Sequence, residues 1–331
     1  MSPPMLDRPE NNIQNNLRKL RDKDLREWRN SGVNDSITKL NVISLVGKES
    51  YQYLTLAERT KRSLESNNNG DRWQKRYSHC EAGGWWCSGI DVLTGMPATW
   101  GQFKPDRPYS IAKKKGFSKS KIIKYESSPR VSTEIYALRV TAEIWQRIAA
   151  VNNVPIPSRV EIDETTGNAP QFWNWVLNNP SIPVTITEGA KKAGALLSLG
   201  LVAIALPGIW NGRRQRKDIF GNKIGSDYPI EQLKVFATKG REINFCFDND
   251  RKASTKKQVR SAIVKTGKLF VKRGCTVKVI DWQYPEKGVD DLIVARKEAV
   301  FREIYARRKP LSAFQLLDVL DLSRFVSLSV S

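Results

Sequence analysis

The sequence predicts an α/β fold, in which a parallel sheet flanked by helices follows a helical segment and a small β-rich module. From about residue 170, short runs of Val, Ile and Phe alternate with helical patterns, an alternation typical of parallel sheets. Residues 17–66 carry apolar side chains at helical spacing. Residues 72–147 are instead rich in Gly, Trp and short β-prone runs, which predicts the β-rich module.

The first helix is expected to begin near residue 17 and to stop at Gly32. Its apolar residues fall near one helical face, at Leu17, Leu20, Leu25 and Trp28. A second helix is predicted over residues 50–66, and the polar stretch that follows it is predicted to be a loop.

Strands in the second half of the chain are expected at 184–188, 202–206, 243–248 and 275–282. Helices are expected before, between and after them, at 172–179, 191–200 and 253–273, with one or two helices over 288–308. The carboxyl ends of parallel strands meet at one edge of the sheet, where ligands of open α/β sheets bind. Polar residues at those strand ends are therefore candidates for a functional site.

The composition points to a polyanionic partner. The chain has 55 Lys and Arg against 34 Asp and Glu, a formal net charge of +21, which favours nucleic acid far ahead of a membrane surface. No apolar run approaches the roughly 20 residues of a membrane span. The first residues show no signal-peptide pattern, and the four cysteines form no C-x-x-C motif. We therefore expect a protein of the reducing cytoplasm that does not engage a membrane.

Acidic residues follow three of the predicted strands. Glu188 ends the first, Asp248 ends the third with Asp250 just beyond it, and Asp290 and Asp291 follow the fourth. At one sheet edge, these carboxylates could hold Mg²⁺, or Mn²⁺, against a phosphate substrate. The alternative is that they are loop or capping residues, and Asp291 in particular could cap a helix.

The order of these motifs resembles the TOPRIM domain, which is shared by bacterial-type primases, topoisomerases and some nucleases. The segments ITEGAKKAGALLSLG, FCFDNDRKA and KGVDDLI carry the resemblance, which covers about residues 170–300. It is closest to the TOPRIM-like domain of primase-type replication proteins carried by bacterial plasmids and phages. The resemblance implies that Glu188 is an acid/base or metal-facing carboxylate and that Asp248 and Asp250 are metal ligands.

The same resemblance implies an auxiliary metal role for Asp290, with Asp291 as a further candidate. It implies a catalytic, phosphate-facing role for Lys191, or for its neighbour Lys192. The leading function is then primase-like, Mg²⁺-dependent nucleotidyl transfer on a DNA template, with nucleoside triphosphates as substrates, in plasmid, phage or mobile-element replication. The alternatives are a nuclease or nicking enzyme using the same carboxylates, and a non-catalytic DNA-binding replication factor. No P-loop motif is present, so any helicase would be a separate protein.

Two basic stretches are candidates for contacting DNA, which we expect to be single-stranded. Residues 100–125 hold eight Lys or Arg, a single Asp and interleaved aromatic residues, a pattern suited to phosphate contacts and base stacking. The candidates there are Lys104, Arg107, Lys113, Lys114 and Lys115. The second stretch, expected to be a loop after the second strand, offers Arg213, Arg214, Arg216 and Lys217. Solvated surface is the alternative for both stretches, and Trp85 and Trp86 are expected to form core.

The chain is expected to divide into four parts. Residues 1–16 are predicted to be a disordered tail and 17–150 a helical plus β-rich, nucleic-acid-binding region. Residues 151–309 are predicted to form the TOPRIM-like catalytic domain. The apolar C-terminal tail, 310–331, is predicted to pack on the sheet or to contact a partner.

Overall fold

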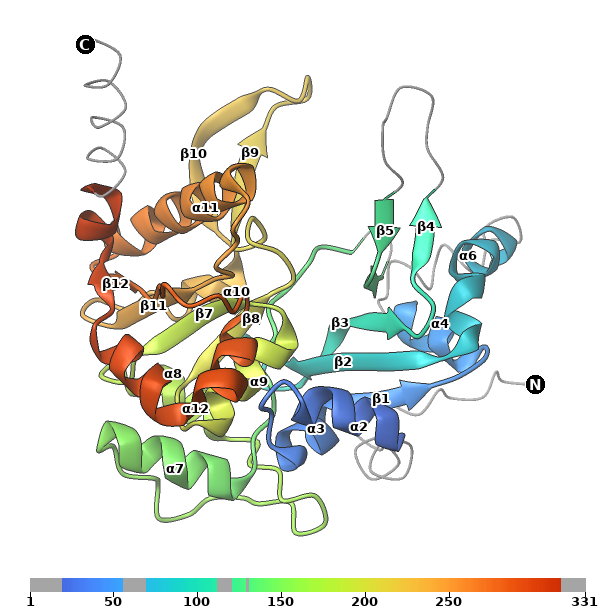
Figure 1. Cartoon of the computed structure of the whole chain (residues 1–331), viewed down its shortest axis with the longest axis horizontal. Helices are drawn as coiled ribbons and strands as arrows, with labels where there is room; N and C mark the ends of the chain where they lie inside the picture. Colours follow the sequence, from blue (N-terminus) through green and yellow to red (C-terminus); the bar gives the residue numbers. More distant parts are fainter. Residues whose placement is uncertain (1–19, 56–69, 112–120, 129–130, 317–331) are drawn as a thin grey trace.

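The structure of the protein is a computed structural model, and the residues it describes are 20–55, 70–111, 121–128 and 131–316. Two sheets with their helices dominate it: an antiparallel sheet from the first half of the chain and a mostly parallel sheet from the second (Figure 1). The predicted disordered tail, the part of the first basic stretch with Lys113, Lys114 and Lys115, and most of the C-terminal tail lie outside the described residues.

The antiparallel sheet has the strand order β1-β2-β3-β6. Its strands are β1 (Val42–Leu45), β2 (Gly84–Ile90), β3 (Pro97–Pro105) and β6 (Glu126–Ser127). A separate hairpin of β4 (Tyr109–Ile111) and β5 (Lys121–Ile123) projects from it (Figure 1). The surrounding helices are α2 (Asp22–Arg29), α3 (Asp35–Asn41), α4 (Glu49–Leu54), α6 (Gly70–Tyr77) and the 3₁₀ helix η2 (Ser78–Ala82).

The first region is less helical than we expected. The first predicted helix is only two turns long within the described residues, as α2, and the second ends at Leu54, beyond which residues 56–66 are not described. Strand β1 was not predicted, because its four residues directly follow helix α3 and resemble an apolar helix end. Antiparallel pairing of Ile43 with Trp86 on β2 makes this segment a strand, an override of local pattern by tertiary contact.

The second sheet has the order β13-β12-β11-β7-β8. It contains β7 (Val184–Glu188), β8 (Ala203–Leu206), β11 (Glu242–Cys246), β12 (Thr276–Val279) and the short antiparallel β13 (Lys309–Pro310). The four predicted strands are confirmed, and all four pair in parallel. They were visible in the sequence because a parallel strand is buried on both faces and reads as an apolar run.

Helices cover both faces of this sheet. Figure 1 shows α11 (Ala253–Val271) on one side and α9 (Ala190–Ser198) with α12 (Val289–Ala306) on the other. The connection from β7 to β8 and the connection from β11 to β12 run in opposite directions across the sheet. Because both crossovers are right-handed, their helices lie on opposite faces of the sheet. The remaining helices are α7 (Ala142–Asn152), α8 (Phe172–Asn178) and α10 (Glu231–Lys234). The predicted α/β fold class is confirmed.

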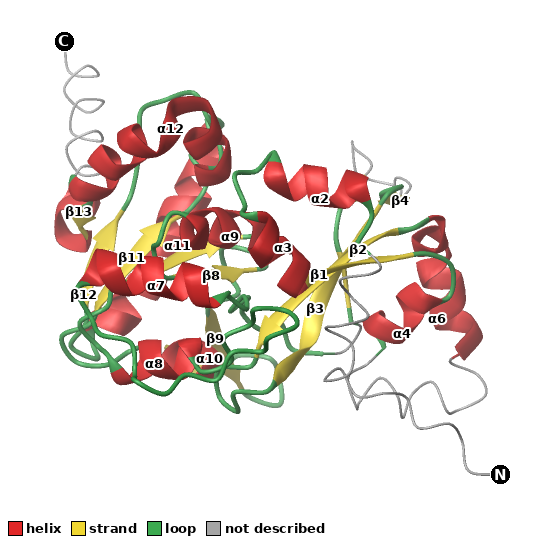
Figure 2. Cartoon of the chain, turned by 90° about the horizontal axis from the view of Figure 1, so that it is seen from below, coloured by secondary structure: helices red, strands yellow, loops and turns green. Residues whose placement is uncertain are grey.

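The two sheets share one hydrophobic core. Tyr136 forms an antiparallel bridge with Ala205 of β8, with N–H to oxygen distances of 2.8 and 3.0 Å, so the connecting segment extends the parallel sheet. Helix α3 packs against α9 (Figure 2). The side chains of Trp85 and Trp86 are buried, as predicted. Helix α7 includes residue 150, at which the sequence predicts a domain boundary. The division of the chain into domains stays a prediction.

The second basic stretch, expected to be a loop after the second strand, lies in a two-stranded hairpin. Its strands are β9 (Arg213–Lys217) and β10 (Lys223–Pro229), and they lie between β8 and α10 along the chain. The basic sequence of β9 carries no alternating apolar pattern, so nothing in it signalled a strand. In the described part of the chain, no helix is long and apolar enough to cross a bilayer.

Candidate active site

Strands β7 and β11 are adjacent, and the chain leaves them toward opposite faces of the sheet. In open α/β sheets such a switch point opens a crevice at the carboxyl ends of the strands, where ligands bind. The Thr187 hydroxyl donates to the Cys246 carbonyl oxygen at 2.7 Å and ties the two strand ends together. Glu188 and Asp248 follow directly from these ends, so the topology alone brings them together.

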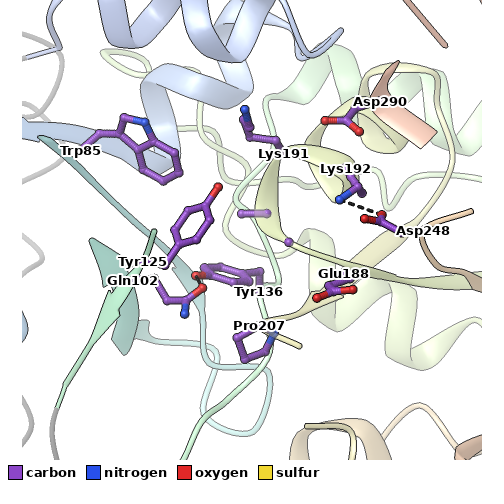
Figure 3. A pocket seen from close by; sticks show the side chains of 12 residues that line it. Trp85, Gln102, Tyr125, Tyr136, Glu188, Lys191, Lys192, Pro207, Asp248 and Asp290 are labelled. Atoms are coloured by element: carbon purple, nitrogen blue, oxygen red, sulfur yellow. Dashed lines mark hydrogen bonds and ion pairs between the residues drawn. The ribbon is translucent and has the colours of Figure 1, made fainter. Parts of the chain in front are cut away.

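A pocket with a volume of about 180 Å³ lies at this crevice. One wall comes from the carboxyl ends of the parallel strands and from the first turns of α9 and α12, and the other from the antiparallel module (Figure 3). The lining residues are Trp85, Gln102, Tyr125, Tyr136, Glu188, Gly189, Ala190, Lys191, Lys192, Pro207, Asp248 and Asp290. Both predicted regions of the chain therefore contribute to one pocket.

Three of the five predicted carboxylates line the pocket: Glu188, Asp248 and Asp290. Asp250 does not line it, but shares Lys287 as an ion-pair partner with Asp248. Asp291 accepts a hydrogen bond from the Gly288 N–H at 3.2 Å and so caps α12, the alternative that the sequence left open for it.

Two lysines neutralise the acidic pair. The Lys192 ammonium lies 2.9 Å from Asp248 Oδ1 (Figure 3). The Lys287 ammonium lies 3.6 Å from Asp248 Oδ2 and 3.3 Å from Asp250 Oδ1. Lys287 was not among the predicted site residues, although it sits in the quoted KGVDDLI segment. Of the two lysines considered for facing phosphate, Lys192 reaches the carboxylates, and Lys191 contacts Glu27 instead.

Charge crowding shifts the pKa of these groups. Burial raises the pKa of Glu188, and the negative charge of Asp248 raises it further. Burial also raises the pKa of Asp290, although Lys192 opposes this. For Lys192, burial alone would lower the pKa, but Asp248 and Asp290 together raise it. Additional positive charge in the pocket would therefore stabilise the ionised forms of these carboxylates.

The chemistry of the acidic side chains, although not their present spacing, suits a hard divalent cation. Asp290 lines the pocket and is buried, and its Oδ1 atom accepts no hydrogen bond from the residues that the structure describes, which is costly for a buried acceptor. The acidic groups offer oxygen only, the ligand type that Mg²⁺ and Mn²⁺ prefer. Among the described residues no three acidic, His or Cys side chains converge on a common point, and lysine ammonium groups lie on the carboxylates.

Glu27 of α2 connects the two walls of the pocket and was not predicted. Its Oε1 atom lies 2.8 Å from Lys104 Nζ and 3.0 Å from Lys191 Nζ. Its Oε2 atom accepts a hydrogen bond from the Trp85 indole at 3.0 Å. Because all three partners lie at least 58 residues away in sequence, no local pattern could have identified this contact.

Some of the side chains predicted to contact nucleic acid are bonded to other residues of the protein, whereas others are exposed. Lys104 pairs with Glu27, and Arg107 is exposed. On the hairpin, Arg213 pairs with Asp227, and Arg214 donates to the carbonyl and the hydroxyl of Thr133 at 3.0 Å each. The side chains of Arg216 and Lys217 are exposed.

The family model described as a domain of unknown function, DUF3854, matches residues 172–300. An uncharacterized protein of Picosynechococcus sp. is 44% identical over 307 residues, which are 92% of this chain and 29% of that protein. This chain therefore spans less than a third of its curated relative.

Among solved structures, the E. coli primase catalytic core is 12% identical, with a TM-score of 0.51 over 93% of this chain and 80% of that one. A DnaG primase catalytic domain bound to single-stranded DNA has a TM-score of 0.49 at 12% identity, over 96% of this chain and 87% of that one. The likeness to the E. coli structure shows that this chain has the fold of a primase catalytic core.

Proposed function

We propose that the protein is a primase-like enzyme that catalyses divalent-metal-dependent nucleotidyl transfer on a single-stranded DNA template. One observation carries the proposal: Glu188, Asp248 and Asp290 line one pocket with Lys192, at the switch point of the parallel sheet. Carboxylates in that position, on a chain with a net charge of +21, suit a substrate rich in phosphate. The fold shared with a primase catalytic core supports the same conclusion.

In this proposal, Glu188, Asp248 and Asp250 would hold Mg²⁺ or Mn²⁺, with Asp290 in an auxiliary role. The bound metal would supply Lewis-acid polarisation of the triphosphate and lower the pKa of the attacking primer hydroxyl. Lys192 and Lys287 bind triphosphate oxygens, since both ammonium groups already lie beside the acidic pair. Burial and the charge of Asp248 raise the pKa of Glu188, which makes this carboxylate a better proton acceptor than an ordinary Glu.

The antiparallel module forms the opposite wall and would contact the template. Tyr125 is 40% exposed at the pocket and packs edge-on against Trp85 at 5.9 Å between ring centroids. An aromatic face beside cationic side chains is suited to an unpaired base. A replication role in a plasmid, phage or other mobile element, with a separate helicase, completes the proposal.

The test is to incubate the protein with single-stranded DNA, labelled nucleoside triphosphates and Mg²⁺ or Mn²⁺, and to separate the products on a denaturing gel. New short oligomers that require template and metal are the expected result. Shortened template without nucleotide incorporation would show that the protein is a nuclease and would overturn the proposal. DNA binding that is indifferent to metal, with neither product, would make the protein a non-catalytic replication factor.

A further inference from the structure

The β9–β10 hairpin ends in a turn that presents two apolar side chains to solvent. Ile219 is 93% exposed and Phe220 is 82% exposed. The turn is held by Asp218, whose Oδ1 atom accepts hydrogen bonds from the backbone N–H groups of Phe220 at 2.9 Å and Asn222 at 2.7 Å. These bonds order the turn locally and fix Phe220 at its tip.

Positive charge surrounds this tip on both strands. Lys217 lies directly opposite Lys223 in the strand register, a like-charge pair that disfavours the hairpin. Lys223 is compensated by Asp227 at 3.0 Å, whereas Lys217 is exposed. Arg216 lies over the ring of Tyr228 at 5.7 Å, and its side chain is exposed as well. A ligand with regularly spaced negative charge would relieve this repulsion.

The basic surface continues from the hairpin onto α11, which packs against β10 (Figure 1). The 19 residues of α11 contain no Asp or Glu. Lys256, Lys257, Lys265 and Lys268 are exposed along it. Trp210 joins the two elements, with Arg213 at 4.9 Å and Lys265 at 5.7 Å from its ring.

We infer that the β9–β10 hairpin is an arm that binds single-stranded nucleic acid. Lys217, Lys223 and the exposed face of α11 contact phosphates, and the ring of Phe220 stacks on an unpaired base. A single strand fits better than a duplex, because its bases offer free faces to an exposed ring, whereas paired bases are already stacked. The inference rests on the DNA-binding part of the proposed function and not on its chemistry.

Binding is measured by fluorescence anisotropy with a labelled single-stranded oligonucleotide, without nucleotides or divalent metal, so that failure of nucleotidyl transfer leaves the result interpretable. A second oligomer of equal length carries abasic sites in place of its bases. The variants are Phe220→Ala, Phe220→Leu, Phe220→Trp and the double variant Lys217→Gln/Lys223→Gln. Leu93→Ala, which removes an apolar side chain that is 47% exposed on the other module, is the matched control.

Phe220→Ala and Phe220→Leu are expected to weaken binding of the base-containing strand by about tenfold and to leave the abasic oligomer unaffected. Phe220→Trp is expected to restore the binding. The double lysine variant is expected to weaken both oligomers and to reduce the salt dependence. The inference is overturned if Phe220→Ala binds the base-containing strand like the wild type. It is also overturned if that variant loses the same factor on both oligomers.

Discussion

The Lys192 ammonium lies 2.9 Å from Asp248 Oδ1, across the crevice between the first turn of α9 and the end of β11. Both side chains are largely buried, with exposed fractions of 19% and 11%. The lysine therefore supplies positive charge where we propose that a divalent cation binds. Competition between the Lys192 ammonium and a divalent metal ion for Asp248 provides a test of the site that does not depend on activity.

Replacement of Lys192 by Met should destabilise the protein by about 1–3 kcal/mol, because the Asp248 carboxylate is left buried without its closest partner. Millimolar Mg²⁺ or Mn²⁺ should restore part of this loss by binding the freed carboxylate. Thermal unfolding with and without metal measures both effects. Lys191→Met is the control, since Lys191 pairs with Glu27. A metal response equal in the two variants would contradict the assigned site.

Substitution of Glu188 by Gln should stabilise the protein at neutral pH by about 0.5–2 kcal/mol while abolishing activity. Burial and Asp248 raise the pKa of Glu188, so the folded state pays a penalty for its ionised form. That penalty is absent below the ordinary Glu pKa and grows as the pH rises through the folded-state value. Unfolding by urea at pH 4 and pH 8 should therefore show the gain only at pH 8. A destabilised Glu188→Gln protein at pH 8 would refute this electrostatic account.

The effect of Glu27→Gln on the free energy of unfolding should depend on pH in the opposite sense, as a loss of stability rather than a gain. Burial alone would raise the pKa of Glu27, but the hydrogen bond from Lys104 and the charge of Lys191 lower it. Its ion pairs therefore stabilise the folded state above the ordinary Glu pKa, and this contribution disappears as the pH falls through the folded-state value. We expect a loss of about 1 kcal/mol at pH 7 and none in strong acid, measured by urea unfolding.

The same Glu27→Gln variant should bind single-stranded DNA more tightly, because Lys104 and Lys191 are released for phosphate contacts. The slope of log K against log salt should steepen by up to about 0.7 for each lysine that gains a phosphate. Anisotropy titrations at several salt concentrations measure this slope. An unchanged slope would mean that neither lysine reaches the DNA.

Arg214 and Arg216 lie two residues apart but should behave differently. Arg214 donates two hydrogen bonds to Thr133, so Arg214→Ala should lower the free energy of unfolding by about 1–2 kcal/mol. Arg216 is exposed, so Arg216→Ala should leave stability within about 0.5 kcal/mol of the wild type and weaken DNA binding. Urea unfolding and anisotropy on both variants test the distinction, and equal stability losses would contradict it.

The sequence was most informative where the chain is buried. The strands that carry Glu188 and Asp248 are apolar runs because helices cover both faces of the sheet, so their ends could be located without a structure. Strand β9 is exposed and basic, and strand β1 depends on its partner β2, so neither had a local signal. Glu27 pairs with Lys104 and Lys191, which lie far from it in sequence, so its place at the pocket could not be predicted from a local pattern.

The most direct test of the central claim is template-dependent primer synthesis by the Asp248→Asn/Asp250→Asn double variant. Both substitutions keep the size of the side chain and remove the negative charge. Asp281→Asn is the matched control, since Asp281 pairs with Lys309 at the edge of the same sheet. We predict a loss of at least about a hundredfold in the double variant and wild-type activity in the control. Primer synthesis by the double variant at the wild-type rate would contradict the proposed site.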